Sequence, residues 1–451
     1  MTDSPLTRLI TSPGKPLHGE YRLPGDKSLS HRMALLAALA EGQSRISNFL
    51  VSGVTEAMLR ALTALEVEWE LSGDQLVVSG RGFGGIKSPR NAIDCGNSAT
   101  TLRLLAGAMA AANIPAILDG SEGLRRRPMD RILTPLQQMG VAITGSAGCA
   151  PLQITPTLLP LKALDYKMPV ASAQVKSCLL LAALSADGPT IVREPGPSRD
   201  HTERLLQAMG VKITSWIEYP SGEAVAQYNT HLLSQNGSPL LPLTIPIPGD
   251  ISSAAFLIVA ALVLPGSEII LRNVGLNPTR TGLLDVLWAM GADIQVLNSS
   301  QEPGEPWGDL LIHSSRLRGT QVSGPLVVRM IDEFPAFAVA AAFAEGETVV
   351  SQAEELRYKE SDRISALCQE FSRLGIHIHE TQDGFTVSGA EMPAGGDVDP
   401  HGDHRLAMAL GLVGLAGSQP VTVQGAQVIG ESFPEFVDVL QSFGADLALE
   451  P

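Results

Sequence analysis

The sequence predicts an α/β protein with two domains, each made of three similar modules of helices and strands. Three observations predict this fold class. A helix that ends in an apolar-glycine step and continues as a β-type run recurs along the chain. The copies lie roughly 70 to 85 residues apart, which is too long for a solenoid repeat and suits a small module. Two similar Pro-Gly-Asp segments stand about half a chain apart, and each opens a set of three modules.

The repeated step marks the end of the second helix of each module. A glycine there suits the residue after a helix, where the backbone adopts a positive φ. The alternation of apolar and polar residues that follows is typical of a half-buried strand. The copies are Leu65-Glu66-Val67, which lacks the glycine, Met139-Gly140-Val141, Met209-Gly210-Val211, Met290-Gly291-Ala292, Leu374-Gly375-Ile376 and Phe443-Gly444-Ala445.

The first helix of a module is rich in Ala and Leu and is followed by a Glu-Gly turn and a β-type run. Residues 34–49 and 338–351 both show this order. Charged residues are nearly absent from Ser177–Ala186 and Ala254–Leu264, so we expect helices there to be buried on most faces, inside the domains.

The two Pro-Gly-Asp segments, at 24–26 and 248–250, place the hinges between the domains near residues 23 and 246. A first strand over Arg8–Tyr21 is expected to belong to the second domain. The predicted domains are 23–245 and 1–22 plus 246–451.

The composition excludes several classes of protein. The chain has 451 residues, of which 44% are hydrophobic and 18% charged, as is typical of folded proteins. With 32 basic and 47 acidic residues the net charge is −15, which argues against a broad nucleic-acid or anionic-membrane surface. No apolar run reaches the roughly 20 residues that span a membrane, and residues 1–13 show no targeting signal, so we expect a cytoplasmic protein. The 4 widely spaced cysteines indicate reduced thiols.

Basic residues at helix starts predict local anion sites in this acidic chain. Lys27 and Ser28 follow a Gly-Asp pair at a predicted helix start, and Arg32 lies one turn later on the Ser28 face. Arg127 precedes a proline that favours an extended backbone, from which its guanidinium can meet a carboxylate or phosphate. Similar small-residue or charged segments occur at 96–103, 172–174, 198–201, 330–334, 358–363 and 402–405.

These segments, in this order and spacing, resemble the EPSP synthase family (3-phosphoshikimate 1-carboxyvinyltransferases) along nearly the whole chain. The matching runs are LPGDKSLSHR at 23–32, DCGNSATTLRLL at 94–105, RRPMDRILTPL at 126–136, VASAQVKSCLLLAAL at 170–184, SRDHTERLL at 198–206, NPTRTGLLDVL at 277–287, MIDEFP at 330–335, ELRYKESDRI at 355–364 and GDHRLAMAL at 402–410. The resemblance implies the two-domain enolpyruvyl transferase fold, an inside-out α/β barrel with three βαβαββ repeats per domain and an active site in the cleft between the domains. It also implies a monomer that needs no metal or organic cofactor.

The implied reaction transfers the enolpyruvyl group of phosphoenolpyruvate to the 5-hydroxyl of shikimate 3-phosphate, on the route to chorismate and the aromatic amino acids. Carried over by position, the residues that hold shikimate 3-phosphate are Lys27, Ser28, Arg32, Ser172, Ala173, Gln174, Arg199, Asp332 and Lys359. Those around phosphoenolpyruvate are Lys27, Asn97, Ala99, Arg127, Gln174, Arg363 and Arg405.

The resemblance also implies catalytic roles for three residues. Asp332 is the expected base at the 5-hydroxyl, and Glu360 is the expected acid at the methylene carbon of phosphoenolpyruvate. Lys27 is expected to stabilise charge on the leaving phosphate. Whether Lys27 also transfers a proton or acts only through its charge stays open.

Ala99 departs from the commonest pattern of the family, in which many members have glycine. The same alanine is found in the glyphosate-tolerant subgroup, so we expect glyphosate to inhibit weakly. The alternative is a neutral exchange of Gly for Ala.

Three alternatives compete with this interpretation. The sister enolpyruvyl transferase, which acts on UDP-N-acetylglucosamine, has a cysteine shortly before the matched Arg-Pro, and residues 120–124 contain none. A protein that only binds anions would need neither Asp332 nor Glu360. A dinucleotide site at Gly80-x-Gly82-x-x-Gly85 would need a following helix, which the sequence after Gly85 does not predict.

Overall fold

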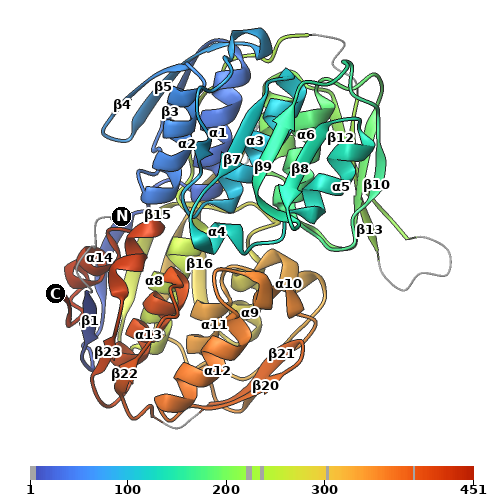
Figure 1. The fold of residues 1–451 in the computed structure, drawn as a ribbon. Coiled ribbons are helices and arrows are strands. Elements are labelled where there is room, and N and C mark those ends of the chain that lie inside the picture. The colour runs from blue at the N-terminus through green and yellow to red at the C-terminus, as the bar shows by residue number, and fades with distance from the viewer. Residues whose placement is uncertain (1–6, 220–225, 234–237, 301–303, 390–391) are drawn as a thin grey trace. The chain divides into compact units, whose positions relative to one another are not determined.

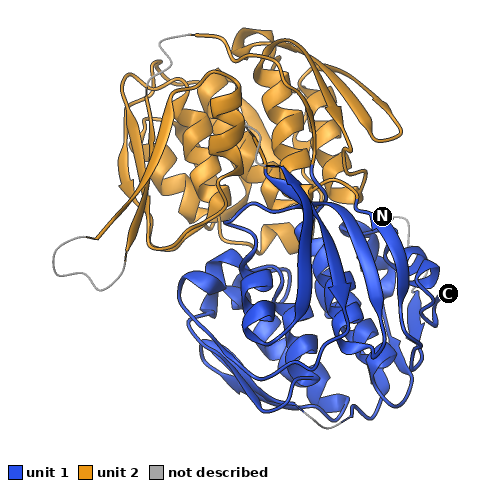
Figure 2. Ribbon diagram, turned by 180° about the vertical axis from the view of Figure 1, so that it is seen from behind, with its two compact units in different colours: residues 1–23, 248–301, 306–451 blue, residues 24–247, 302–305 orange. Residues whose placement is uncertain are grey.

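The computed structural model describes residues 7–219, 226–233, 238–300, 304–389 and 392–451 (Figure 1). Residues 1–6, part of the segment in which the sequence predicts no targeting signal, lie outside the described residues. The chain forms two compact units (Figure 2). Unit 1 comprises residues 1–23, 248–301 and 306–451, and unit 2 comprises residues 24–247 and 302–305.

Within the described ranges, one structural pattern is repeated six times, three times in each unit. Each repeat has a four-stranded sheet whose first strand is parallel to the second, while the other two strands pair antiparallel. Each repeat also has two longer helices, and in the first repeat of each unit the first strand comes from a distant part of the chain. The predicted modules therefore have the order βαβαββ.

Unit 2 contains the repeats that follow the first Pro-Gly-Asp segment. Its first repeat consists of β14 (Thr244–Pro246), α1 (Lys27–Leu39), β3 (Glu41–Ser47), α2 (Gly53–Ala64), β4 (Glu68–Ser72) and β5 (Gln75–Arg81). The second consists of β6 (Ile93–Asp94), α3 (Ala99–Ala112), β7 (Ala116–Asp119), α5 (Asp130–Gln138), β8 (Ala142–Ser146) and β9 (Cys149–Thr155). The third consists of β10 (Asp165–Lys167), α6 (Ala173–Ala183), β11 (Thr190–Glu194), α7 (His201–Ala208), β12 (Ile213–Glu218) and β13 (Gln227–Leu232). The short elements η1 (Phe83–Gly85) and α4 (Glu122–Arg125) lie in connections.

Unit 1 contains the other three repeats. Its first consists of β2 (His18–Arg22), α8 (Ile251–Val263), β15 (Glu268–Gly275), α9 (Gly282–Ala289), β16 (Asp293–Ser300) and β17 (Trp307–His313). The second consists of β18 (Gln321–Val322), α11 (Phe334–Ala342), β19 (Glu347–Val350), α12 (Arg363–Arg373), β20 (His377–Thr381) and β21 (Gly384–Ser388). The third consists of β22 (Gly396–Val398), α13 (His404–Ala416), β23 (Val421–Val423), α14 (Phe436–Ser442), β24 (Leu447–Glu450) and β1 (Arg8–Thr11). The short elements are α10 (Pro325–Arg329), η2 (Glu354–Tyr358) and η3 (Ala426–Glu431).

The prediction of a single first strand over Arg8–Tyr21 is wrong. Strand β1 pairs with β23 and β24, whereas β2 pairs with β15 in a different sheet of unit 1. Pro13 and Pro16 lie between the two strands, and neither has an N–H group to continue a ladder. The chain therefore changes sheets at this point.

The apolar-glycine steps have the backbone conformation that the sequence predicts. All five glycines lie at positive φ, from 78° at Gly375 to 98° at Gly444. Glu66, in the copy that lacks glycine, also has a positive φ of 58°. Because side chains disfavour this region, the repeat imposes the turn even where the residue type resists it.

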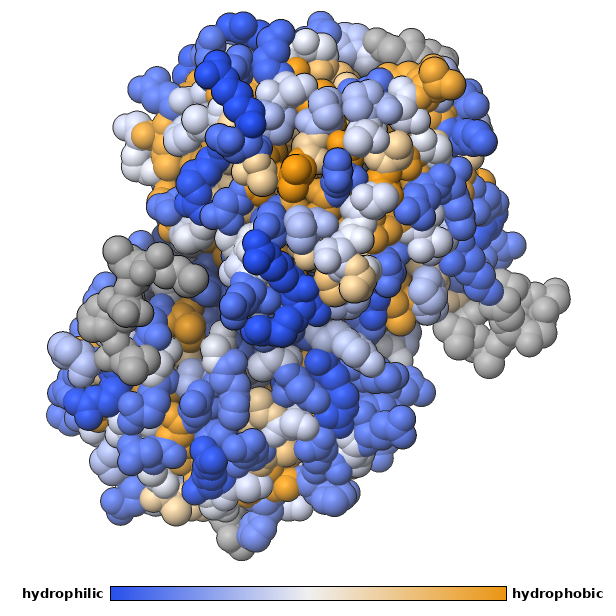
Figure 3. All heavy atoms as spheres, in the orientation of Figure 1, coloured by the Kyte–Doolittle hydropathy of each residue, from blue (hydrophilic) through white to orange (hydrophobic). Residues whose placement is uncertain are grey.

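Apolar helices form the centre of each unit, as expected from their lack of charge. In unit 1, α8, α11 and α13 pack against one another, and residues 251–262 of α8 are buried. In unit 2, α3 packs against α1 and α6. The sheets flank these helices (Figure 1), and hydrophilic residues cover most of the visible face of unit 1 (Figure 3). Among the described helices, none combines the length and the apolar character needed to cross a membrane.

Candidate functional site

Helix N-termini carry the predicted anion-binding residues in unit 2. Helix α1 begins at Lys27, α3 at Ala99 and α6 at Ala173. Each is capped by the side chain of the preceding residue, which accepts a hydrogen bond from a backbone N–H of the first turn; the caps are Asp26, Ser98 and Ser172. The positive ends of these helices favour anions.

Ser28 links two arginines among the predicted substrate contacts, Arg32 and Arg199. The Arg32 side chain is only 3% exposed and donates to the Ser28 carbonyl at 3.0 Å. It also donates to Thr202 Oγ1 at 2.9 Å and to Ser177 Oγ at 3.0 Å. Arg199 donates to Ser28 Oγ at 3.4 Å. Unit 2 therefore brings Ser28, Arg32 and Arg199 together.

Gln174 is held in place by Arg103, a residue that the sequence interpretation did not assign to the site. The Gln174 carbonyl oxygen accepts from Arg103 Nη1, and its amide donates to Thr100 Oγ1 at 2.9 Å. Arg103 Nη2 also donates to the carbonyl of Pro128 at 2.9 Å, directly after Arg127. An arginine within the apolar run of α3 is the signal that could have identified this residue.

His31 lies between the N-termini of α1 and α3. Its Nδ1 is 2.7 Å from the Lys27 carbonyl, and its Nε2 is 3.2 Å from Ser98 Oγ. Burial lowers the pKa of His31 to about 4, and the charges of Lys27 and Arg32 act in the same direction. The imidazole is therefore neutral near pH 7, which fits a structural link between the two helix ends.

Asn97 and Ala99 lie on either side of the α3 cap. Ser121 Oγ donates to Asn97 Oδ1 at 3.0 Å, which fixes the side chain that precedes the cap. Ala99 is the first residue of α3 and is 2% exposed. Its methyl group is thus enclosed by protein.

Unit 1 gathers a second group of predicted residues around Arg363, the first residue of α12. The guanidinium is 1% exposed and donates to Asp403 Oδ2 at 2.7 Å and to Glu360 Oε2 at 2.8 Å. It also lies 3.4 Å from Asp332 Oδ1. Lys359 Nζ is 3.9 Å from the same Asp332 oxygen. The two predicted proton-transfer carboxylates therefore share one buried cation.

Asp403 is a second residue of the site that the sequence interpretation left without a role. It is fully buried and caps α13 by accepting from the Arg405 backbone N–H at 2.9 Å. Burial alone would raise the pKa of Asp403, but Arg363 outweighs it and holds this pKa below its usual value. An aspartate directly before a helix start is the signal in the sequence. Asp403 thus joins the positions of Arg363 and Arg405.

The predicted residues are divided between the units. Unit 2 carries Lys27, Ser28, Arg32, Asn97, Ala99, Arg127, Ser172, Ala173, Gln174 and Arg199. Unit 1 carries Asp332, Lys359, Glu360, Arg363 and Arg405. Cations and helix N-termini in these groups can bind anions, and carboxylates beside the cations can exchange protons with a bound substrate.

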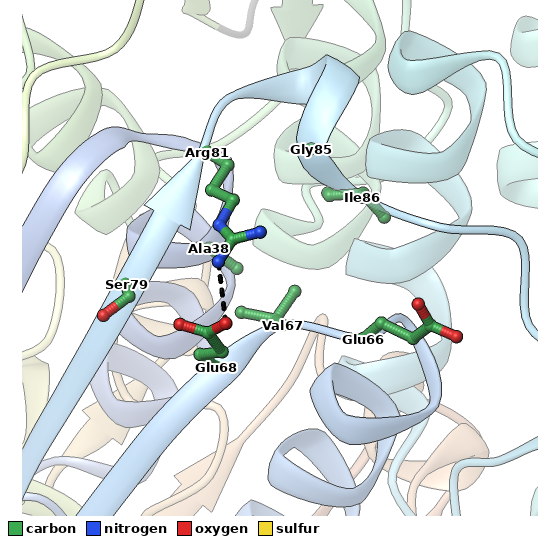
Figure 4. Close-up of a pocket in the computed structure, with 8 residues that line it drawn as sticks. All are labelled: Ala38, Glu66, Val67, Glu68, Ser79, Arg81, Gly85 and Ile86. Carbon is green, nitrogen blue, oxygen red and sulfur yellow. Dashed lines mark hydrogen bonds and ion pairs between the residues drawn. The ribbon is translucent and has the colours of Figure 1, made fainter.

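A small hollow on unit 2 lies elsewhere, between β4, β5 and η1 (Figure 4). Arg81 and Glu68 form an ion pair of 2.7 Å at this hollow. Ala38, Val67 and Ile86 also line it. None of the predicted site residues lines it, so it is not a candidate for the reaction.

Comparison with known proteins identifies the family. The family model described as EPSP synthase (3-phosphoshikimate 1-carboxyvinyltransferase) matches residues 11–440. The chain belongs to the EPSP synthase family. A curated member from Citrifermentans bemidjiense is 44% identical over 431 residues, which are 95% of this chain and 97% of that protein. A member from Synechococcus is 46% identical over 439 residues, which are 96% of each.

Solved structures of EPSP synthases also match. The EPSP synthase from Acinetobacter baumannii, determined at 2.37 Å, has a TM-score of 0.85 and 38% identity, covering 99% of this chain and 100% of that one. The predicted fold class and the predicted activity, that of a 3-phosphoshikimate 1-carboxyvinyltransferase, are confirmed by this membership. The family assignment favours an EPSP synthase over the sister transferase and over a protein that only binds anions.

Proposed function

We propose that this EPSP synthase transfers the enolpyruvyl group of phosphoenolpyruvate to the 5-hydroxyl of shikimate 3-phosphate and releases phosphate. Both substrates are polyanions, because each phosphate carries about −1.5 to −2 charges near pH 7 and each substrate also has a carboxylate. The cations in the proposed contacts offset this charge within an acidic chain; they are Lys27, Arg32, Arg127, Arg199, Lys359, Arg363 and Arg405.

In this proposal unit 2 provides most contacts to shikimate 3-phosphate. The N-termini of α1 and α6 offer backbone N–H groups, and the Ser28–Arg32–Arg199 group supplies hydroxyl and guanidinium donors. Phosphoenolpyruvate is proposed to meet Lys27, Asn97, Ala99, Arg127 and Gln174 of unit 2, with Arg363 and Arg405 of unit 1.

The observation that carries the chemical proposal is the pair of carboxylates beside Arg363. Asp332 and Glu360 are 19% and 20% exposed, whereas Arg363 is 1% exposed. The cation is thus fixed within the protein, while both carboxylates retain access to a bound molecule. This arrangement suits two groups that exchange protons with a substrate.

Addition and elimination then follow in two steps. In the first step Asp332 takes the proton of the 5-hydroxyl while the hydroxyl oxygen bonds to C2 of phosphoenolpyruvate. In the same step Glu360 gives a proton to the methylene carbon C3 of phosphoenolpyruvate. The result is a tetrahedral ketal that still carries the phosphate. Glu360 then removes a proton from the new methyl group, the C2–O bond to phosphate breaks, and the double bond reforms. Lys27 stabilises the charge on the departing phosphate.

We further propose that Ala99 weakens inhibition by glyphosate. The family commonly has glycine at this position, and the alanine methyl is enclosed at the start of α3. An added methyl beside the phosphoenolpyruvate site leaves less room for a longer inhibitor than for the compact substrate. A monomer located in the cytoplasm completes the proposal, on the basis of the family resemblance.

Phosphate release tests the proposed reaction. Purified protein is incubated with phosphoenolpyruvate and either shikimate 3-phosphate or UDP-N-acetylglucosamine, without added metal. Release that depends on shikimate 3-phosphate is the expected result. Release only with the sugar nucleotide, or with neither acceptor, contradicts the proposal.

A further inference from the structure

Helix α6 of unit 2 contains a buried lysine that the proposed reaction does not use. Lys176 is 3% exposed, in a helix that is apolar from Cys178 to Ala183. Its Nζ lies 2.7 Å from Glu194 Oε1 and 2.8 Å from Glu203 Oε1. Both carboxylates are buried as well. A lysine is seldom fully buried unless it is paired, and here the two carboxylates provide the partners.

The lysine also reaches the loop that precedes α7. Nζ donates to the carbonyl of Ser198 at 3.3 Å, and Ser198 Oγ donates to Glu194 Oε2 at 2.7 Å. Ser198 is therefore held through both its backbone and its side chain. The next residue is Arg199, which contacts Ser28 Oγ.

A second polar pair lies beside the first, one residue later in α6 and one residue earlier in α7. Ser177 of α6 and Thr202 of α7 have hydroxyl oxygens 2.6 Å apart, and both accept from Arg32. The Lys176–Glu203 and Ser177–Thr202 pairs thus fix α6 against α7. The first pair holds the loop of Arg199, and the second holds Arg32.

We propose that Lys176 is a positioning residue for shikimate 3-phosphate, because it fixes the Arg199 loop against the N-terminus of α6, which carries Ser172, Ala173 and Gln174. This inference rests on the proposed function, in which those residues bind that substrate. Lys176 itself does not touch the reacting atoms in this proposal. Loss of Lys176 weakens the binding of shikimate 3-phosphate selectively. The loop that Lys176 holds carries a proposed contact to shikimate 3-phosphate and none to phosphoenolpyruvate.

The charges of the group are consistent with this role. Burial favours the neutral amine, but Glu194 and Glu203 outweigh it, so the pKa of Lys176 is raised and the ammonium persists. Burial raises the pKa of Glu203. Among the described residues, Glu203 Oε2 has no hydrogen-bond partner, so this carboxylate depends mainly on Lys176. Lys176 therefore supplies the positive charge that compensates Glu194 and Glu203 beside the loop.

The test compares the Kd for shikimate 3-phosphate, measured by calorimetry without phosphoenolpyruvate, with the KM for phosphoenolpyruvate. Lys176→Gln is expected to raise that Kd about tenfold, the effect of losing one charge-assisted hydrogen bond. The KM for phosphoenolpyruvate, measured at saturating shikimate 3-phosphate, is expected to change by less than about threefold in the same variant. Equal increases in both constants, or no increase in the Kd, overturn the proposal.

Two further variants keep the test decisive. Ser198→Ala removes the loop's bond to Glu194 without leaving a buried charge unpaired, so it folds even if Lys176→Gln does not. It is expected to raise the same Kd by a smaller factor, and an unchanged Kd overturns the proposal. Thr230→Val is the matched control, because Thr230 is buried and donates to Glu203 Oε1 at 3.4 Å but does not contact the loop. Absence of phosphate release by the wild-type protein would instead contradict the proposed function itself.

Discussion

Asp403 Oδ2 accepts a hydrogen bond of 2.7 Å from Arg363 Nε, and both side chains are almost fully buried. Removing one member of such a pair leaves the other charge without compensation in a low-dielectric environment. The position of Arg363, and through it the positions of Asp332 and Glu360, therefore depends on a residue that has no role in proton transfer.

Asp403→Asn is expected to lower the free energy of unfolding by about 3 kcal/mol, because Arg363 loses a buried partner. Urea unfolding of the variant and the wild-type protein measures the difference. Asp119→Asn is the control, since the guanidinium of its partner Arg125 is 52% exposed and solvent weakens such an ion pair. Equal losses in the two variants would show that burial does not strengthen the Asp403 contact.

Asp332→Asn and Glu360→Gln are each expected to lower kcat by about 100-fold or more, because each removes a group that exchanges a proton with the substrate. Steady-state phosphate release at saturating substrates measures the effect. Glu354→Gln, an exposed position of η2, is expected to leave kcat unchanged. A kcat close to that of the wild-type protein for either site variant rules out the role assigned to that residue.

Ala99→Gly is expected to increase inhibition by glyphosate, because it removes the methyl group at the start of α3. The concentration of glyphosate that halves phosphate release is compared between the two proteins at the same phosphoenolpyruvate concentration. The KM for phosphoenolpyruvate serves as the control and is expected to change little. Equal inhibition of both proteins would support a neutral exchange of Gly for Ala.

Stability is expected to depend on pH through His31. Its pKa in the folded protein is lowered to about 4, whereas an unfolded histidine has a pKa of about 6.5. Between these values the unfolded chain binds the proton and the folded chain does not. The free energy of unfolding therefore falls as the pH drops below about 6.5, by up to about 1.4 kcal/mol per pH unit, and this contribution levels off below the folded pKa.

Urea unfolding at pH 7 and pH 5 tests the effect of His31. His31→Gln is expected to lose less stability between these pH values than the wild-type protein does. His377→Gln, at an exposed position of β20, is the control and is expected to retain the wild-type dependence. Identical losses for His31→Gln and the wild-type protein would assign the pH dependence to other groups.

Much of the fold could be predicted because the repeat carries a strong local signal. The glycines at positive φ, such as Gly140, lie where a helix ends and the chain turns into a strand. The sequence pattern shows these positions directly. Helix starts at Lys27, Arg363 and His404 follow capping residues that are visible in the sequence. The resemblance to a family then assigned site residues whose roles the local patterns alone did not indicate.

The rest depends on contacts between distant parts of the chain, which local patterns do not specify. The switch of sheets between β1 and β2 requires strands more than 240 residues away, as the pairing of Glu268 with His18 shows. Arg103, Lys176 and Asp403 each act through partners that are distant in sequence. A charged residue in or beside an apolar helix indicates that the residue has a specific partner. It does not indicate which partner that is.

The N-terminal strand β1 lies between β23 and β24 in its sheet, and this has a consequence for how the protein is made. Strand β1 is synthesised before β23 and β24, and its neighbours include residues 447–450, so that sheet is completed only once those residues have been added. Unit 2, apart from four residues, is one continuous segment from 24 to 247 and can fold while the ribosome is still adding the remainder. A chain released early would then present a folded unit 2 preceded by two strands without partners, a state that chaperones and proteases recognise.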